Sequence, residues 1–557
     1  MLHLVVAAAA LAPPEVSLDP YGKLSGAWDT SSSAVAAFRD VPYAEAGRFE
    51  VPKPPKPWSG TRDASKFGVG CAQRGSSHNP DVPTNRSEDC QRLNVFAPWP
   101  PRMAKPVPVM VWWHGGAYTE GSSYGPFDLY DGGKIVAHSD VVIVSCNYRL
   151  GAVRAARACC PAHYPSTAHT HDLCSSPVQL GALVHDGGLG GNYGFLDQRA
   201  CLQWVQANAI TFGGDAANVT VWGQSAGAQS IWLHMASNRS TGLFHRAILE
   251  SAVDLSLFTT KQAAKLGRET AKLVGCTEGT DAERIACLRA ADLDALLDAA
   301  NKAQGSFLTI AESISLKHPT GSFLPFKPNI DGIEFVEQPF ATLLGGRAPA
   351  AVPAIVGFNH DEMWALLSSL PSWLKGFEVE AGLMILFGAS VGVEAWRHYS
   401  ALYPGDTTAA VVKILTDYLF TCAGQASALA LPRPSYVYQY NHVDSFGPTI
   451  FNKFGLPQCA VHQRVCHMAE IPLVFNNSGP ASLNASLTPA EHALSATIID
   501  AFTSFVKGGS PEGSTGWAPF TTPQRAGLLI NQTAKAAPLG EAATVCTKIW
   551  DKTGYLI

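Results

Sequence analysis

The chain has 557 residues, of which 46% are hydrophobic and 15% are charged, and its formal net charge is −5. This composition is typical of a globular protein with an extensive core, and the length fits either several domains or one long α/β unit. Because the sequence contains no basic run, no acidic tail and no repeat of 20–50 residues, nucleic acid is not an expected partner and a repeat array is excluded.

The first twelve residues form a short apolar segment that ends at Ala10-Leu11-Ala12, a small-x-small pattern. This pattern predicts a secretory signal peptide over residues 1–12, too short to span a bilayer. No basic residue precedes the apolar segment, so a ragged hydrophobic terminus is the alternative. No later segment reads as a membrane span. Thirteen cysteines also suit an oxidising compartment, as do glycosylation sequons at Asn85, Asn238, Asn476, Asn484 and Asn531.

Apolar, β-branched runs alternate with stretches of helical periodicity along the chain. This alternation predicts an α/β fold with a mostly parallel central sheet and helices on both faces. The region from about residue 20 to 557 reads as one such unit, with helical insertions at 260–345 and 364–430. Strands are expected at 93–96, 107–113, 141–146, 219–222, 244–249, 354–357 and 436–440, and helices at 194–210 and 489–506.

Residues 153–179 fit this scheme poorly. They begin with an Arg- and Ala-rich stretch and continue as a run of His, Pro, Ser and Thr. The segment shows neither the hydrophobic periodicity of a helix or strand nor a recognisable pattern of turn residues. Leu150-Gly151-Ala152 before the segment recurs as Leu180-Gly181-Ala182 after it. We interpret the segment as a loop insertion or as translated intron sequence, and peptide mapping of the native protein distinguishes the two.

The strand expected at 219–222 runs into Gly223-Gln224-Ser225-Ala226-Gly227, and a helical stretch follows. A strand, a tight turn and a helix are the context of a nucleophile elbow, in which a serine is exposed on a strained turn. Gly-x-Ser-x-Gly alone is a weak pattern, and a chance match is the alternative. In this context the pattern predicts that Ser225 is a nucleophile.

A serine nucleophile also needs N–H donors for the oxyanion, a base to take its proton and an acid to orient that base. His114-Gly115-Gly116-Ala117 follows a core strand, as the glycine-rich oxyanion loop of esterases does. The N–H groups of Gly116, Ala117 and Ala226 are therefore the expected donors, with a simple tight turn as the alternative reading of the loop. The base must lie late in the chain, with the acid between it and the serine.

Among the seventeen histidines, His467 has the best context for that base. Seven stretches then match one known family in their order along the chain: residues 87–90, 114–117, 147–151, 212–215, 223–227, 357–362 and 467–471. Through them the sequence resembles the type-B carboxylesterase/lipase family, the α/β-hydrolases that include cholinesterases. The resemblance runs from about residue 30 to the end.

The resemblance implies an α/β-hydrolase fold, no cofactor, and a triad of Ser225, Glu362 and His467. In the family pattern the second acid of Asp361-Glu362 is the triad member. The resemblance leaves Glu470 a structural role, and His462 lacks the Glu-Ile that follows His467. The reaction would be hydrolysis of a small carboxylic ester through an acyl-enzyme.

Cysteines and ion pairs also follow the family pattern. The resemblance implies disulfides Cys71–Cys90, Cys276–Cys287 and Cys422–Cys546, while Cys459 and Cys466 are close enough in sequence to pair. Cys146, Cys159, Cys160, Cys174 and Cys201 stay unassigned, and no Cys-x-x-Cys supports a metal site. Arg48 with Glu88, and Arg149 with Asp215, resemble the family's structural ion pairs.

Departures from the family bear on the substrate. Gln224 stands where many members carry Glu, which removes a negative charge beside the nucleophile. The loop from Cys71 to Cys90 contains no Trp, whereas cholinesterases use one there to hold a quaternary ammonium. Choline esters are therefore poor candidates. Ser251 is a possible partner of the triad, and Phe323 and Phe326 line an acyl pocket or are plain core residues.

The sequence thus predicts a secreted serine esterase that acts on small-molecule esters. A lipase acting on longer acyl chains with the same triad is one alternative. A non-catalytic, cholinesterase-like adhesion protein is another, although all three triad positions are filled here. The oligomeric state is left open.

Overall fold

A computed structural model describes residues 12–74, 83–151, 191–252, 256–304, 328–367, 376–461, 464–480, 483, 485–511 and 515–556. The signal peptide (all but its last residue), the segment 153–179 and the two phenylalanines Phe323 and Phe326 lie outside these residues, so those expectations stay predictions. Among the described residues, no helix combines the length and the apolar character needed to cross a bilayer.

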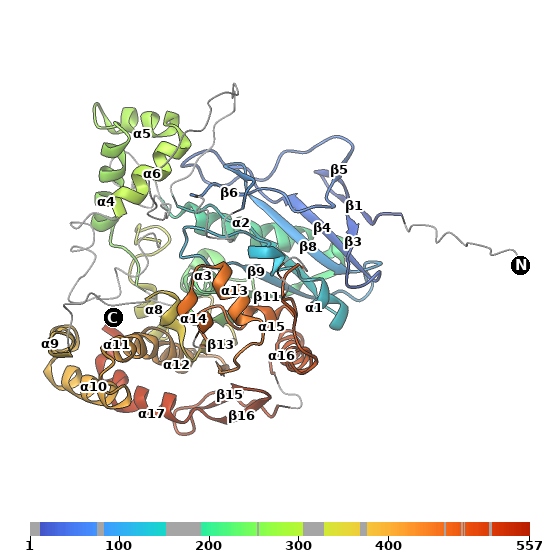
Figure 1. Ribbon diagram of the computed structural model, residues 1–557. Coiled ribbons are helices and arrows are strands. Elements are labelled where there is room, and N and C mark those ends of the chain that lie inside the picture. The colour runs from blue at the N-terminus through green and yellow to red at the C-terminus, as the bar shows by residue number, and fades with distance from the viewer. Residues whose placement is uncertain are drawn as a thin grey trace, which may run out of the picture.

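An 11-stranded sheet organises the fold, in the order β16-β15-β14-β13-β12-β11-β9-β10-β8-β4-β3 (Figure 1). The strands from β10 through β9 and β11 to β15 are parallel, and the outer pairs are antiparallel. The strands are β1 Glu15–Leu18, β2 Gly22–Ser25, β3 Ala27–Trp28, β4 Val35–Pro42, β5 Thr61–Asp63, β6 Gly70–Cys71, β7 Arg86–Ser87, β8 Arg92–Pro98, β9 Val107–Trp113, β10 Val142–Cys146, β11 Gly214–Gln224, β12 Arg246–Glu250, β13 Ala354–Asn359, β14 Ser435–Tyr440, β15 Ala526–Ile530 and β16 Ala534–Pro538.

Helices cover both faces of this sheet. The α-helices are α1 Gly133–His138, α2 Tyr193–Asn208, α3 Ala226–Ala236, α4 Thr260–Leu273, α5 Asp281–Ala290, α6 Leu293–Gln304, α8 Pro339–Leu344, α9 Gly376–Phe387, α10 Ala389–Leu402, α11 Thr407–Thr416, α12 Ala423–Ala430, α13 Gly447–Lys453, α14 Pro457–Val461, α15 Ile471–Val474, α16 Pro489–Gly508 and α17 Glu541–Lys548. The other helical segments are η1 Pro126–Asp128, η3 Ala209–Phe212, η4 Asn238–Ser240, η6 Glu362–Ala365, η7 Asp417–Cys422 and η9 Trp550–Leu556.

The core lies in two layers, one on each face of the sheet. Val109 and Val111 of β9 belong to one apolar cluster, together with residues of α2 and α3. Met110 and Trp112 belong to the other, together with residues of α1 and α16. Successive side chains of a strand point to opposite faces, so a strand that is apolar throughout must be covered on both sides. This explains why the parallel strands read as continuous apolar runs in the sequence.

The helical insertions occur where the sequence predicts them. Helices α4, α5 and α6 lie between β12 and β13 in the chain, and α9 to α12 lie between β13 and β14. Figure 1 shows α4, α5 and α6 gathered at one corner of the molecule, and α9, α10 and α11 at another. The long helix α16 begins with a capping box between Thr488 and Glu491, and Gly509, whose φ is 81°, caps its C-terminal end. These local signals fix its ends.

Five disulfides join the described cysteines. Four are the expected pairs, Cys71–Cys90, Cys276–Cys287, Cys422–Cys546 and Cys459–Cys466. The fifth, Cys146–Cys201, links the end of β10 to α2. The sequence left these two cysteines unassigned, because their positions 55 residues apart carry no local signal of pairing.

One expected ion pair is wrong. Arg149 pairs with Asp197 of α2 through two N–O contacts of 2.7 Å, and both side chains are buried. Arg149 follows the carboxyl end of β10, whereas Asp215 lies at the beginning of β11. The two strands run in the same direction, so these positions lie at opposite edges of the sheet. The other expected pair, Arg48 with Glu88, is present with an N–O distance of 3.7 Å.

Candidate active site

Ser225 lies at the turn between β11 and α3. Its φ of 56° and ψ of −123° are unusual for a residue other than glycine, and such strain is characteristic of functional turns. A Cβ on Gly227 would lie 2.1 Å from the carbonyl oxygen of Trp113, and a Cβ on Gly223 would lie 2.8 Å from it. Only glycine permits the end of β9, the serine turn and α3 to approach this closely, which is why both glycines flank the serine.

The glycine-rich loop follows β9 at the same edge of the sheet. Gly116 and Ala117 have φ of 100° and 53°, and within the described residues their N–H groups make no hydrogen bond to a protein acceptor. Ala226 is the first residue of α3, so its N–H has no partner within the helix. These three groups are available as donors to an anion.

Buried contacts fix the position of this loop. His114 stacks on Tyr148 with ring centroids 4.4 Å apart, and the Tyr148 hydroxyl donates to the carbonyl of His114 at 2.6 Å. Burial lowers the pKa of His114 to about 4, so this histidine is neutral and structural. Gln73, close to the Cys71 disulfide, exchanges two hydrogen bonds of 2.8 Å with the backbone of Gly121.

Glu362 and His467 form a direct contact. Nδ1 of His467 lies 2.6 Å from Oε2 of Glu362, and both side chains are buried. The other carboxylate oxygen, Oε1, accepts a hydrogen bond of 2.7 Å from the backbone N–H of Asn359. Glu362 follows β13 and His467 lies on the loop between α14 and α15. The carboxylate therefore orients the ring and holds the proton on Nδ1.

The neighbouring acid Asp361 has a different task. Its Oδ2 accepts from the backbone N–H of Val465 at 3.1 Å, and its own N–H donates to the carbonyl of Val465 at 3.0 Å. Asn359 also donates to the carbonyl of Cys466 at 3.0 Å. The end of β13 thus anchors the loop that carries His467, and only the second acid, Glu362, faces the ring.

The pKa of His467 lies above its ordinary value of 6.5. Burial alone lowers it, but the charge and hydrogen bond of Glu362 raise it, and the charge of Glu470 adds to this effect. Carboxylates next to a buried imidazole favour the imidazolium form. The ring can therefore accept a proton during a reaction and hold it against a carboxylate.

Gln224 brings the ring to the serine turn. Its side-chain amide lies 3.1 Å from Nε2 of His467, and it directly precedes Ser225. Since Nδ1 faces a carboxylate, Nε2 is the acceptor in the neutral ring and the amide donates. In the described residues no hydrogen bond joins the Ser225 hydroxyl to His467. Ser225, His467 and Glu362, the three residues expected to form a triad, nevertheless lie at the same edge of the sheet.

The structure adds one residue that the sequence reasoning missed. Glu250 ends β12 directly opposite Gln224 of β11 and is fully buried. The sequence feature that could have identified Glu250 is an acidic residue at the end of an otherwise apolar strand. Ser251, the next residue, is buried with a φ of 51°, and its hydroxyl has no partner among the described residues. No hydrogen bond therefore joins its hydroxyl to Ser225, Glu362 or His467 in the part of the chain that the structure describes.

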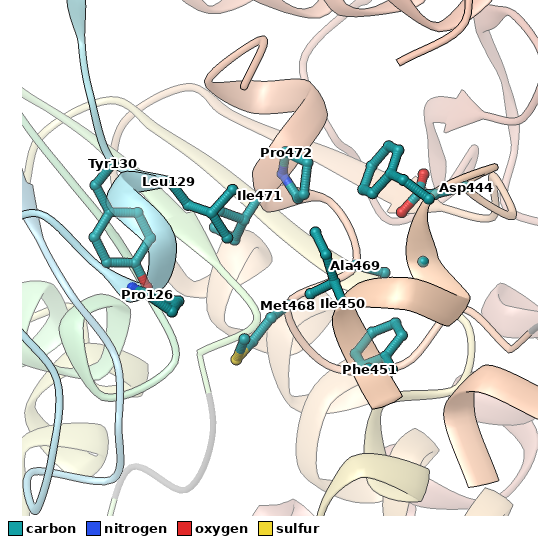
Figure 2. Close-up of a pocket in the computed structure, with 12 residues that line it drawn as sticks. Pro126, Leu129, Tyr130, Asp444, Ile450, Phe451, Met468, Ala469, Ile471 and Pro472 are labelled. Atoms are coloured by element: carbon teal, nitrogen blue, oxygen red, sulfur yellow. The ribbon is translucent and has the colours of Figure 1, made fainter. Parts of the chain in front are cut away.

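An apolar pocket lies beside the histidine loop. Figure 2 shows Met468 and Ala469, which follow His467, together with Ile450 and Phe451 of α13 and with Leu129. Asp444 is the one ionisable carboxyl group among its lining residues. Such a lining suits an apolar group better than a charged one.

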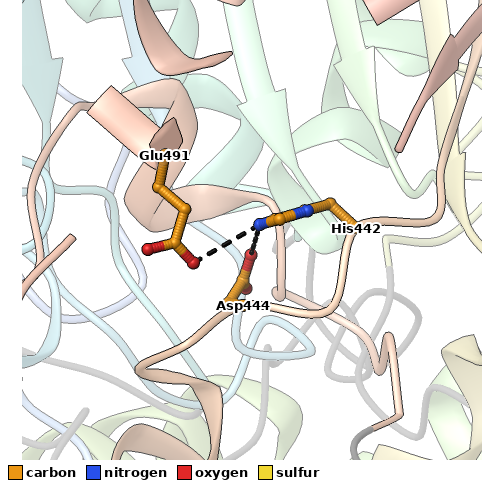
Figure 3. A group of neighbouring side chains, drawn as sticks. All are labelled: His442, Asp444 and Glu491. Atoms are coloured by element: carbon orange, nitrogen blue, oxygen red, sulfur yellow. Dashed lines mark hydrogen bonds and ion pairs between the residues drawn. The ribbon is translucent and has the colours of Figure 1, made fainter. Parts of the chain in front are cut away.

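His442, Asp444 and Glu491 form a group that resembles a metal site (Figure 3). The Glu491 carboxylate, however, already accepts four hydrogen bonds of 2.6–2.8 Å from Ser445 and Thr488. Burial alone raises its pKa, but these bonds lower it to about 2. The Tyr440 hydroxyl donates to Asp444 at 2.6 Å. Because the carboxylates are satisfied by protein donors, this group serves the start of α16 rather than a cation.

The fold and the site together define an α/β-hydrolase, with the reactive groups at the carboxyl ends of parallel strands. The carboxylesterase family matches residues 12–153 and 180–547. The interval between these two ranges falls within the segment expected to be an insertion. The chain belongs to the carboxylesterase family, and it is a carboxylic ester hydrolase of the serine hydrolase type.

Individual proteins are similar to this chain over most of its length. The chain is 35% identical over 519 residues to the "Crystal protein" of Dictyostelium discoideum, covering 88% of this chain and 83% of that protein. It is 30% identical over 523 residues to the para-nitrobenzyl esterase of Bacillus subtilis, covering 92% and 94%. A solved structure of PNB esterase matches with a TM-score of 0.74 and 28% identity, covering 98% of this chain and 99% of that one.

Proposed function

We propose that the protein hydrolyses small, uncharged carboxylic esters through an acyl-enzyme on Ser225, with His467 as general base and Glu362 as the orienting acid. The observation that carries this proposal is the 2.6 Å contact between Oε2 of Glu362 and Nδ1 of His467. The other ring nitrogen, Nε2, lies 3.1 Å from the side-chain amide of Gln224, the residue next to Ser225. This arrangement supports the proposal because acyl transfer through a serine requires a base that is close to the serine and oriented by an acid.

In the first step His467 takes the proton of the Ser225 hydroxyl at Nε2 while the serine oxygen attacks the ester carbonyl. The imidazolium is stabilised by Glu362 and then gives its proton to the leaving alcohol. In the second step water attacks the acyl-enzyme and His467 again takes and returns a proton. The proton on Nδ1 stays between His467 and Glu362 throughout.

The oxyanion that forms in each step needs donors placed in advance. The free N–H groups of Gly116, Ala117 and Ala226, with α3 directed at the site by its N-terminus, support this role. The loss of one such donor costs about 100-fold or more in turnover.

The neutral side chain of Gln224 next to the nucleophile favours uncharged esters over cationic ones. The absence of Trp between Cys71 and Cys90 supports the same preference. A series of p-nitrophenyl esters of increasing acyl length separates an esterase from the lipase alternative, because a lipase would gain activity with chain length.

We further propose that the protein acts in the secretory pathway or outside the cell. Five disulfides fit an oxidising compartment, and the apolar segment 1–12 fits a signal peptide. Sequencing the N-terminus of the protein recovered from culture medium tests this: a mature chain that begins near Pro13 supports it, and an intact Met1 contradicts it.

The catalytic assignment is tested with Ser225→Ala, Glu362→Gln and His467→Gln. We expect losses in kcat of about 10⁴-fold or more for each, with folding intact. His360→Gln is the matched control, because His360 lies two residues before Glu362 with a half-exposed ring. An organophosphate should label the wild type but not Ser225→Ala. An unchanged hydrolysis rate in Ser225→Ala, or no hydrolysis and no labelling of the wild type, would refute the proposal.

A further inference from the structure

Two buried glutamates that the proposed reaction does not use lie behind the triad. Glu250 ends β12 and Glu470 directly precedes α15, and neither side chain is exposed to solvent. Oε1 of Glu250 accepts a hydrogen bond from the indole N–H of Trp222. Oε2 of Glu470 accepts one from the side-chain amide of Asn359.

Each of these carboxyl groups leaves its second oxygen without a donor. Oε2 of Glu250 and Oε1 of Glu470 are buried and have no hydrogen-bond partner among the described residues. The Tyr438 hydroxyl, on which the charges of both glutamates act, is also buried and unpartnered there. A buried polar atom without a partner carries a large desolvation penalty. A proton on one of the two carboxyl groups would convert it into a hydrogen-bond donor, which these unpartnered oxygens lack.

The charges around the pair work against full ionisation. Burial, and then the charge of Glu470, raise the pKa of Glu250 well above its ordinary value, while the Trp222 hydrogen bond lowers it. Burial and the charge of Glu362 raise the pKa of Glu470 to about 7, against the lowering effects of Asn359 and His467. Neighbouring buried carboxylates cannot all ionise at neutral pH.

We propose that Glu250 and Glu470 together carry one proton at neutral pH and that Glu250 holds it, so that the negative charges of Glu362 and Glu470, without a third, act on His467. Glu250 is thereby a positioning residue that acts through Glu470 on the base. A third negative charge in this buried cluster would stabilise the imidazolium further and favour protonation of the base at neutral pH. With the shared proton, Glu362 and Glu470 keep the ring basic enough to take the proton of Ser225 and still neutral at rest.

The inference rests on the proposed role of His467, but its first test does not need turnover. Infrared difference spectra of the full chain at neutral pH compare the wild type with Glu250→Gln, which matches a neutral acid in size. We expect the wild type to show the carbonyl stretch of a protonated carboxyl group that is missing in Glu250→Gln. Spectra without such a difference, or a Glu250→Gln chain that fails to fold, would overturn the proposal.

The second test separates Glu250 from Glu470. In Glu470→Gln the ring loses a carboxylate whose charge raises its pKa, so the acid limb of the kcat/KM pH profile should move to lower pH by about one unit. In Glu250→Gln, where a neutral amide replaces a neutral acid, the acid limb should stay at its wild-type pH. Equal downward shifts in both variants would show that Glu250 is ionised and would overturn the proposal.

A titration of the His467 ring by NMR in the Ser225→Ala background repeats this comparison without catalysis. We expect the pKa of the His467 ring to fall in Glu470→Gln and to stay unchanged in Glu250→Gln. If Ser225→Ala itself left hydrolysis unchanged, the proposed function would fail, while the infrared band and the ring titration would still decide whether the two glutamates share a proton.

Discussion

The side-chain amide of Gln224 donates to Nε2 of His467 across 3.1 Å. Nε2 is the nitrogen that must accept the proton of the nucleophile, since Nδ1 is held by Glu362 at 2.6 Å. In the resting protein the acceptor is thus occupied by the residue beside Ser225. Under the proposed mechanism the amide must release the ring, or turn its oxygen toward it, each time the imidazolium forms.

Gln224→Glu should therefore change the pH dependence of hydrolysis. A carboxylate beside Nε2 stabilises the imidazolium, so the pKa of His467 should rise and the acid limb of kcat/KM should move up by about one pH unit. The measurement is a pH profile with an uncharged ester. Gln224→Met, similar in length but without a charge, is the control. It removes the hydrogen bond that favours the neutral ring, so it should move the limb upward by less than Gln224→Glu does. A Gln224→Glu profile that overlays the profile of the wild type or of Gln224→Met would contradict the expectation.

The wild-type pH profile follows from the environment of His467. A general base works only when unprotonated, so kcat/KM should rise with pH through the pKa of the free enzyme's base. Glu362 and Glu470 hold that pKa above 6.5 despite burial, so the midpoint of the acid limb should lie above 6.5. A midpoint well below 6.5 would show that burial outweighs the carboxylates.

Gly227→Ala tests the close approach at the serine turn. The new Cβ would lie 2.1 Å from the carbonyl oxygen of Trp113 and 2.8 Å from that of His114, so the backbone must shift. We expect the free energy of unfolding to fall by about 1–3 kcal/mol and turnover to fall strongly, because the shifted atoms carry the glycine-rich loop to which we assign the oxyanion donors. Chemical denaturation and kcat measure the two effects.

Gly382→Ala is the matched control for this substitution. Gly382 lies inside α9, and a Cβ there would meet no atom within 4 Å. Alanine should therefore stabilise the helix by up to about 1 kcal/mol and leave turnover unchanged. Equal effects of the two substitutions would argue against the steric account of Gly227.

Asp197→Ala and Asp215→Ala distinguish the observed ion pair from the one that the sequence suggested. Removing Asp197 leaves the buried guanidinium of Arg149 without its carboxylate, which should cost about 3–5 kcal/mol of unfolding free energy. Asp215 contributes one hydrogen bond to the N–H of Ala217, so its loss should cost about 1 kcal/mol. Denaturant titrations of the two variants give the comparison, and a larger loss for Asp215→Ala would contradict the structure.

The parallel strands and the residues at their ends could be predicted because each signal is local. The serine turn is an example: the apolar run of β11, the two glycines and the helical stretch of α3 occupy neighbouring positions in the sequence. A few consecutive residues therefore determine the backbone geometry of this turn. The same holds for the capping box of α16. The position of His467 followed from the family pattern rather than from local signals.

The remaining contacts could not be read from the sequence. The family pattern suggested Asp215 as the partner of Arg149, and only the direction of the strands shows that Asp215 lies at the opposite edge of the sheet while Asp197 of α2 is within reach. The partner of Gln224 lies 243 positions away, and nothing in either local sequence indicates the contact.

The sequence by itself determined the order of elements, the serine turn and four of the five disulfides, since these depend on local backbone preferences and on a motif order shared with a family. Only the tertiary structure decided which buried charges face one another, above all Arg149 with Asp197 and Glu362 with His467. The physical reason is that hydrophobic periodicity specifies which face of an element is buried, whereas the partner of a buried polar atom depends on which side chains the packed elements bring into the same space.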